Sequence, residues 1–150
     1  MNSPVIDRAC WSVLVKKTED KIAALQLEIS QARKRIESLE GSQSRIQSMY
    51  DDYRNRLNDS QTESQGMREA MNQRQFMAQL LTLLQRVNLD IQHTQNLLAS
   101  QRERMLELER ERIKMQTLAN QNAIAVQKDK NRKEQKQMDS LAVMQFNMRA

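Results

Sequence analysis

The sequence predicts an all-α protein: a long antiparallel two-helix coiled-coil hairpin with a C-terminal helical overhang. Apolar residues repeat at alternating spacings of three and four, glycine and proline are scarce, and one polar stretch interrupts the repeat. The chain has 150 residues with Gly 2 and Pro 1, which leaves little turn chemistry for a fold of many elements. We therefore expect one domain over residues 1–150.

The first helix is expected over about residues 4–58. Ser3 and Pro4 suit its N-cap and first turn, and Asp7 suits the positive end of the helix dipole. The apolar repeat fills a and d positions of successive heptads, with Thr18 and Gln43 as its polar exceptions. Its apolar members are Trp11, Val15, Ile22, Leu25, Ile29, Ala32, Ile36, Leu39, Ile46, Tyr50, Tyr53 and Leu57.

The polar stretch from Asn58 to Gly66 predicts a bend at about residues 59–66, followed by a longer second helix at about 67–145. The second helix carries a similar repeat: Ala70, Met77, Leu80, Leu84, Val87, Ile91, Leu98, Met105, Leu108, Met115, Ala119 and Val126. Each apolar stripe needs a partner, and the nearest one is on the same chain, so we expect the helices to fold back on each other. Paired residue numbers should add to about 125, which leaves the end of the second helix as the overhang.

The formal net charge of +5 is concentrated near the C-terminal end, where residues 112–136 hold seven basic and two acidic side chains. Such a segment can meet nucleic acid, anionic lipid or an acidic protein surface, or be a solvated helix face. A leucine-zipper transcription factor has its basic region before the zipper, whereas this one follows the seam. Nucleic acid is therefore not expected as a partner.

Membrane and metal chemistry are not expected either. No run of 18 apolar residues is present, which argues against a transmembrane helix and favours a cytoplasmic chain without direct membrane insertion. Cys10 and His93 are the only residues of their kinds, too few for a disulfide framework or a metal site. A two-helix rod also lacks a pocket for catalysis, so we expect no enzyme and no cofactor.

Two places carry more apolar residues than a two-helix seam can cover. Near the bend, aromatic and aliphatic side chains of both helices meet, with Leu81 as an extra member; they either seal the hairpin tip or bind a partner. In the overhang, a methionine-rich stripe that includes Met138 and Leu141 either docks on another protein or frays.

Three stretches of the chain are similar to a known family. They are Tyr53-Arg54-Asn55-Arg56-Leu57-Asn58, then Arg74-Gln75-Phe76 with Leu80, and Gln135-Lys136-Gln137-Met138-Asp139-Ser140-Leu141-Ala142 preceded by Gln116-Thr117-Leu118. In their order and spacing the chain resembles the FliJ family, the stalk proteins of the bacterial flagellar type III export apparatus.

The resemblance implies a hairpin similar to the central stalk of rotary ATPases, linking a hexameric export ATPase to a membrane-embedded export-gate protein and assisting export chaperones. It implies a cytoplasmic protein peripherally associated with the inner-membrane export machinery. The gate-facing residues would be Ile46, Tyr50, Tyr53, Phe76, Leu80, Leu83 and Val87. The residues placed in the ATPase ring would be Trp11, Lys128, Arg132, Lys133, Met138 and Leu141.

Two alternatives remain open at this point. The same heptad pattern and length fit the equivalent stalk of a virulence-type injectisome. They also fit a structural or chaperone coiled coil that dimerises through its seam and has no ATPase partner.

Overall fold

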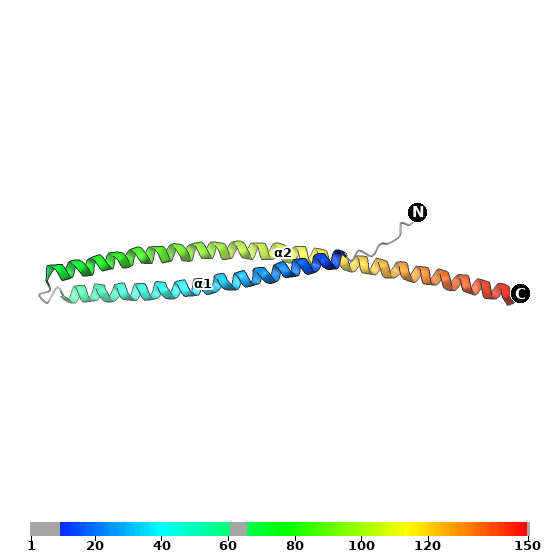
Figure 1. Cartoon of the computed structure of the whole chain (residues 1–150), viewed down its shortest axis with the longest axis horizontal. Coiled ribbons are helices and arrows are strands. Elements are labelled where there is room, and N and C mark those ends of the chain that lie inside the picture. Colours follow the sequence, from blue (N-terminus) through cyan, green and yellow to red (C-terminus); the bar gives the residue numbers. More distant parts are fainter. Residues whose placement is uncertain (1–9, 61–65, 150) are drawn as a thin grey trace. The chain divides into compact units, whose positions relative to one another are not determined.

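A computed structural model describes residues 10–60 and 66–149, and these form two helices (Figure 1). Helix α1 is Cys10–Ser60 and helix α2 is Met67–Arg149. The two long helices pack against each other as a hairpin, which confirms the predicted fold class. The expected N-cap at Ser3 and most of the expected bend lie outside the described residues.

The start of α2 is defined by backbone hydrogen bonds to Gly66. The carbonyl oxygen of Gly66 accepts from the amides of Glu69, at 3.1 Å, and Ala70, at 3.3 Å. Glu69 also lies in the first turn, where its negative charge suits the positive end of the helix dipole. These interactions favour a helix that begins directly after Gly66.

The chain divides into two compact units, and each contains a part of both helices. Unit 1 comprises Met1–Ala23 and Leu106–Ala150, and unit 2 comprises Ala24–Met105. Each helix has residues in both units and is continuously helical along its length.

In unit 2 the a and d residues of the two helices form the core. The buried members are Leu25, Ile29, Ala32, Ile46, Met77, Leu80, Val87, Ile91 and Leu98. None of the large side chains in the described residues is less than 2% exposed, because two helices cannot enclose a side chain from all directions. The core is therefore a seam along the helix pair.

The register of unit 2 differs from the predicted one. Gln43 hydrogen-bonds to Asn88, and the ring of Tyr53 lies against that of Phe76. Paired residue numbers thus add to about 130 instead of about 125, a shift of roughly one helical turn. The expected value was wrong because the register is determined by side-chain contacts between the helices, and the position of the bend alone does not fix it.

In unit 1 the first part of α1 lies beside the neighbouring part of α2 (Figure 1). Val15, Ile22 and Leu108 are buried there. The a and d residues that follow on α2, from Met115 to Val126, are half-buried. From residue 130 to residue 149 every side chain is exposed, so this part of α2 is the predicted overhang.

Neither described helix has a stretch long and apolar enough to cross a membrane.

Candidate partner-binding surfaces

The aromatic residues of unit 2 cluster at the end of the hairpin near the bend. The centroids of the Tyr53 and Phe76 rings are 4.8 Å apart, and the ring planes are tilted by 52°. Aromatic pairs favour such a tilted arrangement over face-to-face stacking. The Arg56 guanidinium carbon lies 5.4 Å from the centroid of the Tyr53 ring, within range of a cation–π interaction. The ring contact joins the end of α1 to the beginning of α2, and the Arg56 contact lies within α1.

The structure divides the seven predicted gate-facing residues into two groups. Ile46, Leu80 and Val87 are buried in the core at 8%, 5% and 8% exposure, so they hold the hairpin together and offer a partner little surface. Tyr50, Tyr53 and Phe76 pack against this core and are half-buried, while Leu83 is exposed. The accessible part of the predicted site therefore consists of the aromatic side chains and Leu83.

Met49 is an exposed residue at this end of unit 2 that sequence reasoning missed. Leu83 occupies a g position of α2, and the observed register brings the g position of α1 at Met49 close to it. Met49 is 43% exposed and Leu83 is 45% exposed. The sequence contained a signal for Met49: both helices have an apolar residue at a g position, which widens the apolar stripe beyond a and d. We call Met49, Tyr53, Phe76 and Leu83 the tip surface.

A shallow groove runs along α2 beside the tip surface. It is lined by Gln75, Ala78, Gln79, Thr82, Leu83 and Arg86. Leu83 is the large apolar residue in this lining, and the amides and Arg86 surround it with hydrogen-bonding groups. The groove suits a helix or extended segment that covers one apolar side chain and bonds to polar neighbours.

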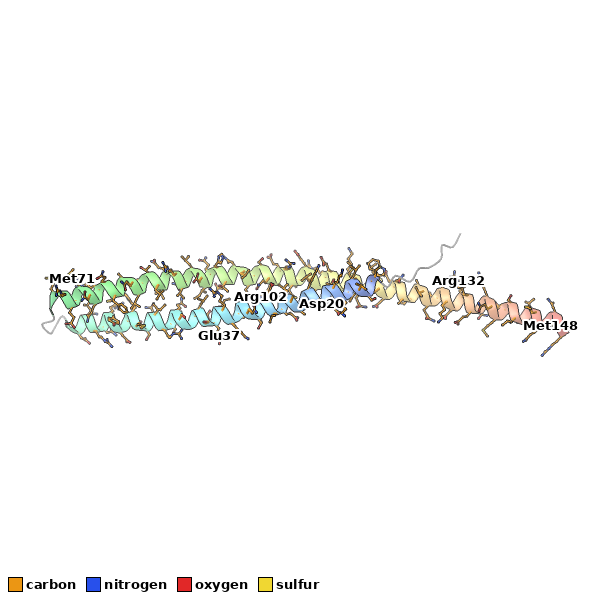
Figure 2. All side chains as sticks on the ribbon, in the orientation of Figure 1. Asp20, Glu37, Met71, Arg102, Arg132 and Met148 are labelled. Carbon is orange, nitrogen blue, oxygen red and sulfur yellow. The ribbon has the colours of Figure 1, made fainter. Side chains whose placement is uncertain are left out.

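The predicted ATPase-facing residues belong to unit 1, and most of them are fully accessible. Lys128, Arg132, Lys133, Met138 and Leu141 are exposed, and Trp11 is half-buried. Figure 2 shows Arg132 and Met148 projecting from α2, where no other helical segment of unit 1 lies alongside. We call residues 128–149 the C-terminal segment.

Charge in the C-terminal segment is partly paired. Lys133 Nζ lies 3.3 Å from Asp129 Oδ2, one helical turn away, and the Lys133 side chain is still 69% exposed. An exposed pair of this kind contributes little to stability, so Lys133 remains available to an acidic partner. The same segment contains five further basic groups: Lys128, Lys130, Arg132, Lys136 and Arg149.

A second groove in unit 2 forms around Ala32, whose small side chain leaves space at a d position. Its lining includes His93, Asp90 and Glu28. The described residues contain no group of three or more His, Cys, Asp or Glu side chains that could hold a metal ion. This groove therefore shows no constellation for metal binding.

The family of the chain follows from comparison with known proteins. A family model described as "Flagellar FliJ protein" matches residues 12–150, which includes nearly all of both helices. The chain belongs to the FliJ family. No curated protein and no solved structure matches the chain.

FliJ-family proteins are non-catalytic components of flagellar export, so the chain is not an enzyme and its partners belong to the flagellar export apparatus. The matched model is a flagellar one, and it places the chain in flagellar export instead of a virulence-type injectisome. The particular partners and the residues that bind them are proposed below.

Proposed function

We propose that the chain is the stalk that links the hexameric export ATPase to the membrane export-gate protein and assists export chaperones. It acts in the cytoplasm, peripherally associated with the export machinery of the inner membrane. The main support, beyond family membership, is the pair of exposed apolar surfaces, one in each unit. An exposed apolar surface of this kind is typical of a protein-binding site.

The C-terminal segment is the proposed contact for the ATPase ring. Its basic side chains attract an acidic surface from a distance, and Met138 and Leu141 supply apolar contact area once the helix has docked. A continuous helix with an exposed apolar side is a common way to occupy a groove in another protein. Trp11, half-buried in the same unit, would extend this contact.

The tip surface is the proposed contact for the export gate. Tyr53 and Phe76 each keep one part of the ring in the hairpin and leave another part accessible, while Met49 and Leu83 add exposed aliphatic area. Large, partly exposed aromatic side chains are frequent energetic centres of protein interfaces. The buried residues Ile46, Leu80 and Val87 support these side chains from beneath.

The ATPase contact is tested by measuring affinity of the purified chain for the export ATPase. Arg132→Glu combined with Leu141→Glu should weaken binding by at least about tenfold, because charge and apolar contact are both lost. Leu27→Glu is the matched control: Leu27 is exposed on α1 in unit 2 and belongs to neither proposed surface. Equal affinity of the wild type and the double variant would rule out this contact.

The gate contact is tested with the soluble domain of the gate protein. Leu83→Glu should weaken binding by about tenfold or more, because a charge would be placed in an apolar contact. Leu89→Glu, on an exposed position of the same helix, is the control. Circular dichroism should show unchanged helicity for both variants, since neither residue is in the core. Unchanged binding by Leu83→Glu would contradict the proposal.

A further inference from the structure

A second apolar repeat runs along α2 in unit 1, on the side of the helix away from the hairpin seam. The side chain of each residue in this repeat is more than half exposed. They are Leu106, Ile113, Ile124, Met138, Leu141 and Met148. We call this the outer face.

The outer face lies on two positions of the heptad frame that the seam defines. With the seam at a and d, Leu106 and Ile113 occupy b positions, and Ile124 occupies an f position. The b and f positions are adjacent on the helix surface and lie opposite the a–d edge, so the stripe cannot contact α1 through the seam.

The polar residues between these apolar ones are mostly uncharged. The remaining b and f positions from 106 to 148 are Arg110, Thr117, Asn120, Gln127, Asn131, Glu134 and Gln145. Gln127 donates to the Asn131 Oδ1 atom at 3.0 Å, and the Thr117 hydroxyl donates to the Ile113 carbonyl at 2.8 Å. A face composed of aliphatic residues and amides is suited to packing against another helix and has little charge to repel one.

In unit 2 the equivalent face of α2 has a different character. Its b and f positions are occupied mainly by polar or small side chains, with Met71 and Leu89 as the large apolar exceptions. The outer face is thus a local property of unit 1, and the general composition of the helix does not account for it. Within the described residues nothing covers it.

We infer that the outer face binds the outer face of a second copy of this chain, in antiparallel orientation. When two such helices are paired about Gln127, Leu106 meets Met148 of the second copy and Ile113 meets its Leu141. The two apolar residues at each end of the face thus meet apolar partners, whereas Ile124 and Met138 lie opposite polar residues. A face that is complementary to itself in this way forms a closed two-fold dimer.

Charge distribution selects the antiparallel orientation. Residues 115–127 contain no charged side chain, and the basic residues begin at Lys128. Antiparallel pairing about Gln127 places the basic part of each copy, centred near Arg132, against the uncharged part of the other. Parallel pairing in register would instead place the two basic parts side by side, where like charges repel.

This inference does not rest on the proposed ATPase contact, and the two make different predictions. Both use Met138 and Leu141, so a dimer would hide part of the C-terminal segment, and an ATPase ring would compete with the second copy. The dimer is tested on the purified chain alone, so its failure would leave the ATPase contact unaffected.

Sedimentation equilibrium of the full chain provides the first test. At a chain concentration on the order of 100 µM, we expect a mass twice the 17.6 kDa of one chain. Ile113→Glu combined with Leu141→Glu should return the mass to that of one chain, with helicity retained by circular dichroism because both residues are exposed. Leu27→Glu and Leu89→Glu, exposed residues of unit 2, should leave the dimer intact.

If the wild type had the mass of one chain at this concentration, the proposal would be overturned. The same conclusion would follow if the unit 2 variants dissociated the dimer as much as the outer-face variant does. If the dimer is absent and the same outer-face variants weaken binding to the ATPase or gate protein, the face belongs to that partner.

Disulfide formation provides the second test, because it reports orientation. Cys10→Ser removes the native thiol, and Leu106→Cys and Met148→Cys are then introduced into separate chains. On mixing and mild oxidation, the antiparallel dimer should link a chain with Cys at 106 to a chain with Cys at 148. Links only between identical chains would contradict the antiparallel orientation.

Discussion

At the scale of single residues, the polar members of the seam are accommodated by local hydrogen bonds. The hydroxyls of Thr18 and Thr94 donate to backbone carbonyls one turn earlier, at 2.9 Å and 2.7 Å. Gln43 instead donates across the hairpin to Asn88 Oδ1, at 2.6 Å. A polar pair of this kind specifies register more than it adds stability, because a shift of one turn would leave both amides without their partner.

Replacing Thr94 by valine should stabilise the hairpin by about 0.5–1 kcal/mol. Thr94 is buried, at 5% exposure, and its hydroxyl bonds to a carbonyl that already belongs to the helix ladder. A methyl group at this site gains apolar burial without leaving a donor unpaired. Urea denaturation measures the change, with exposed Thr82→Val as the control. A fall in the free energy of unfolding would show that the hydroxyl makes a net contribution.

At the scale of the helix, Gly41 is the residue of α1 least suited to its conformation. It lies inside α1 without a positive φ angle, and a Cβ atom there would meet only the end of the Arg45 side chain, at 3.9 Å. No steric constraint therefore requires glycine at this position, and its main effect is to make the chain more flexible.

Gly41→Ala should accordingly raise the free energy of unfolding by about 0.5–1 kcal/mol, since alanine restricts the unfolded chain and favours the helix. Thermal unfolding followed by circular dichroism measures the effect. A decrease in stability would contradict this prediction.

Helix α2 also contains neighbouring leucines with different roles. Leu80 is 5% exposed in the core, whereas Leu83, three residues later, is 45% exposed. Leu80→Ala should destabilise the hairpin by about 2–4 kcal/mol, because it leaves a cavity between the helices. Leu83→Ala should cost less than about 1 kcal/mol. Denaturant titrations measure both changes. If the two variants lost similar free energies of unfolding, Leu83 would contribute to the core near the bend as much as Leu80 does.

At the scale of the whole molecule, the proposed stalk has its two contact surfaces on different compact units. Each surface consists of residues from one unit only, so the two binding reactions should be separable by substitution. This arrangement differs from a binding site formed between units, in which one substitution would affect both partners.

We therefore expect a double dissociation. Arg132→Glu with Leu141→Glu should weaken ATPase binding by at least about tenfold and leave gate affinity within about twofold, whereas Leu83→Glu should do the reverse. Affinities for both purified partners, measured for both variants, check this. Loss of both affinities from either variant would mean that the surfaces are coupled or that the fold is damaged.

The sequence alone determined the helices, the hairpin and the membership of the seam. Every a and d residue predicted between Trp11 and Val126 is buried or half-buried, including the polar exceptions Thr18 and Gln43. Heptad periodicity is local information, because the spacing of apolar residues along one helix defines the face that must be covered. Three short stretches were also enough to suggest the family.

Only the tertiary structure decided which helical turns meet and which apolar residues remain accessible. Register depends on contacts between helices, such as that of Gln43 with Asn88, and a shift of one turn keeps the heptad pattern almost unchanged. For the same reason the sequence grouped Leu80 with Leu83 in one surface. The packed hairpin separates them, since α1 covers the a–d edge of α2, where Leu80 lies, and leaves Leu83 at its g position exposed.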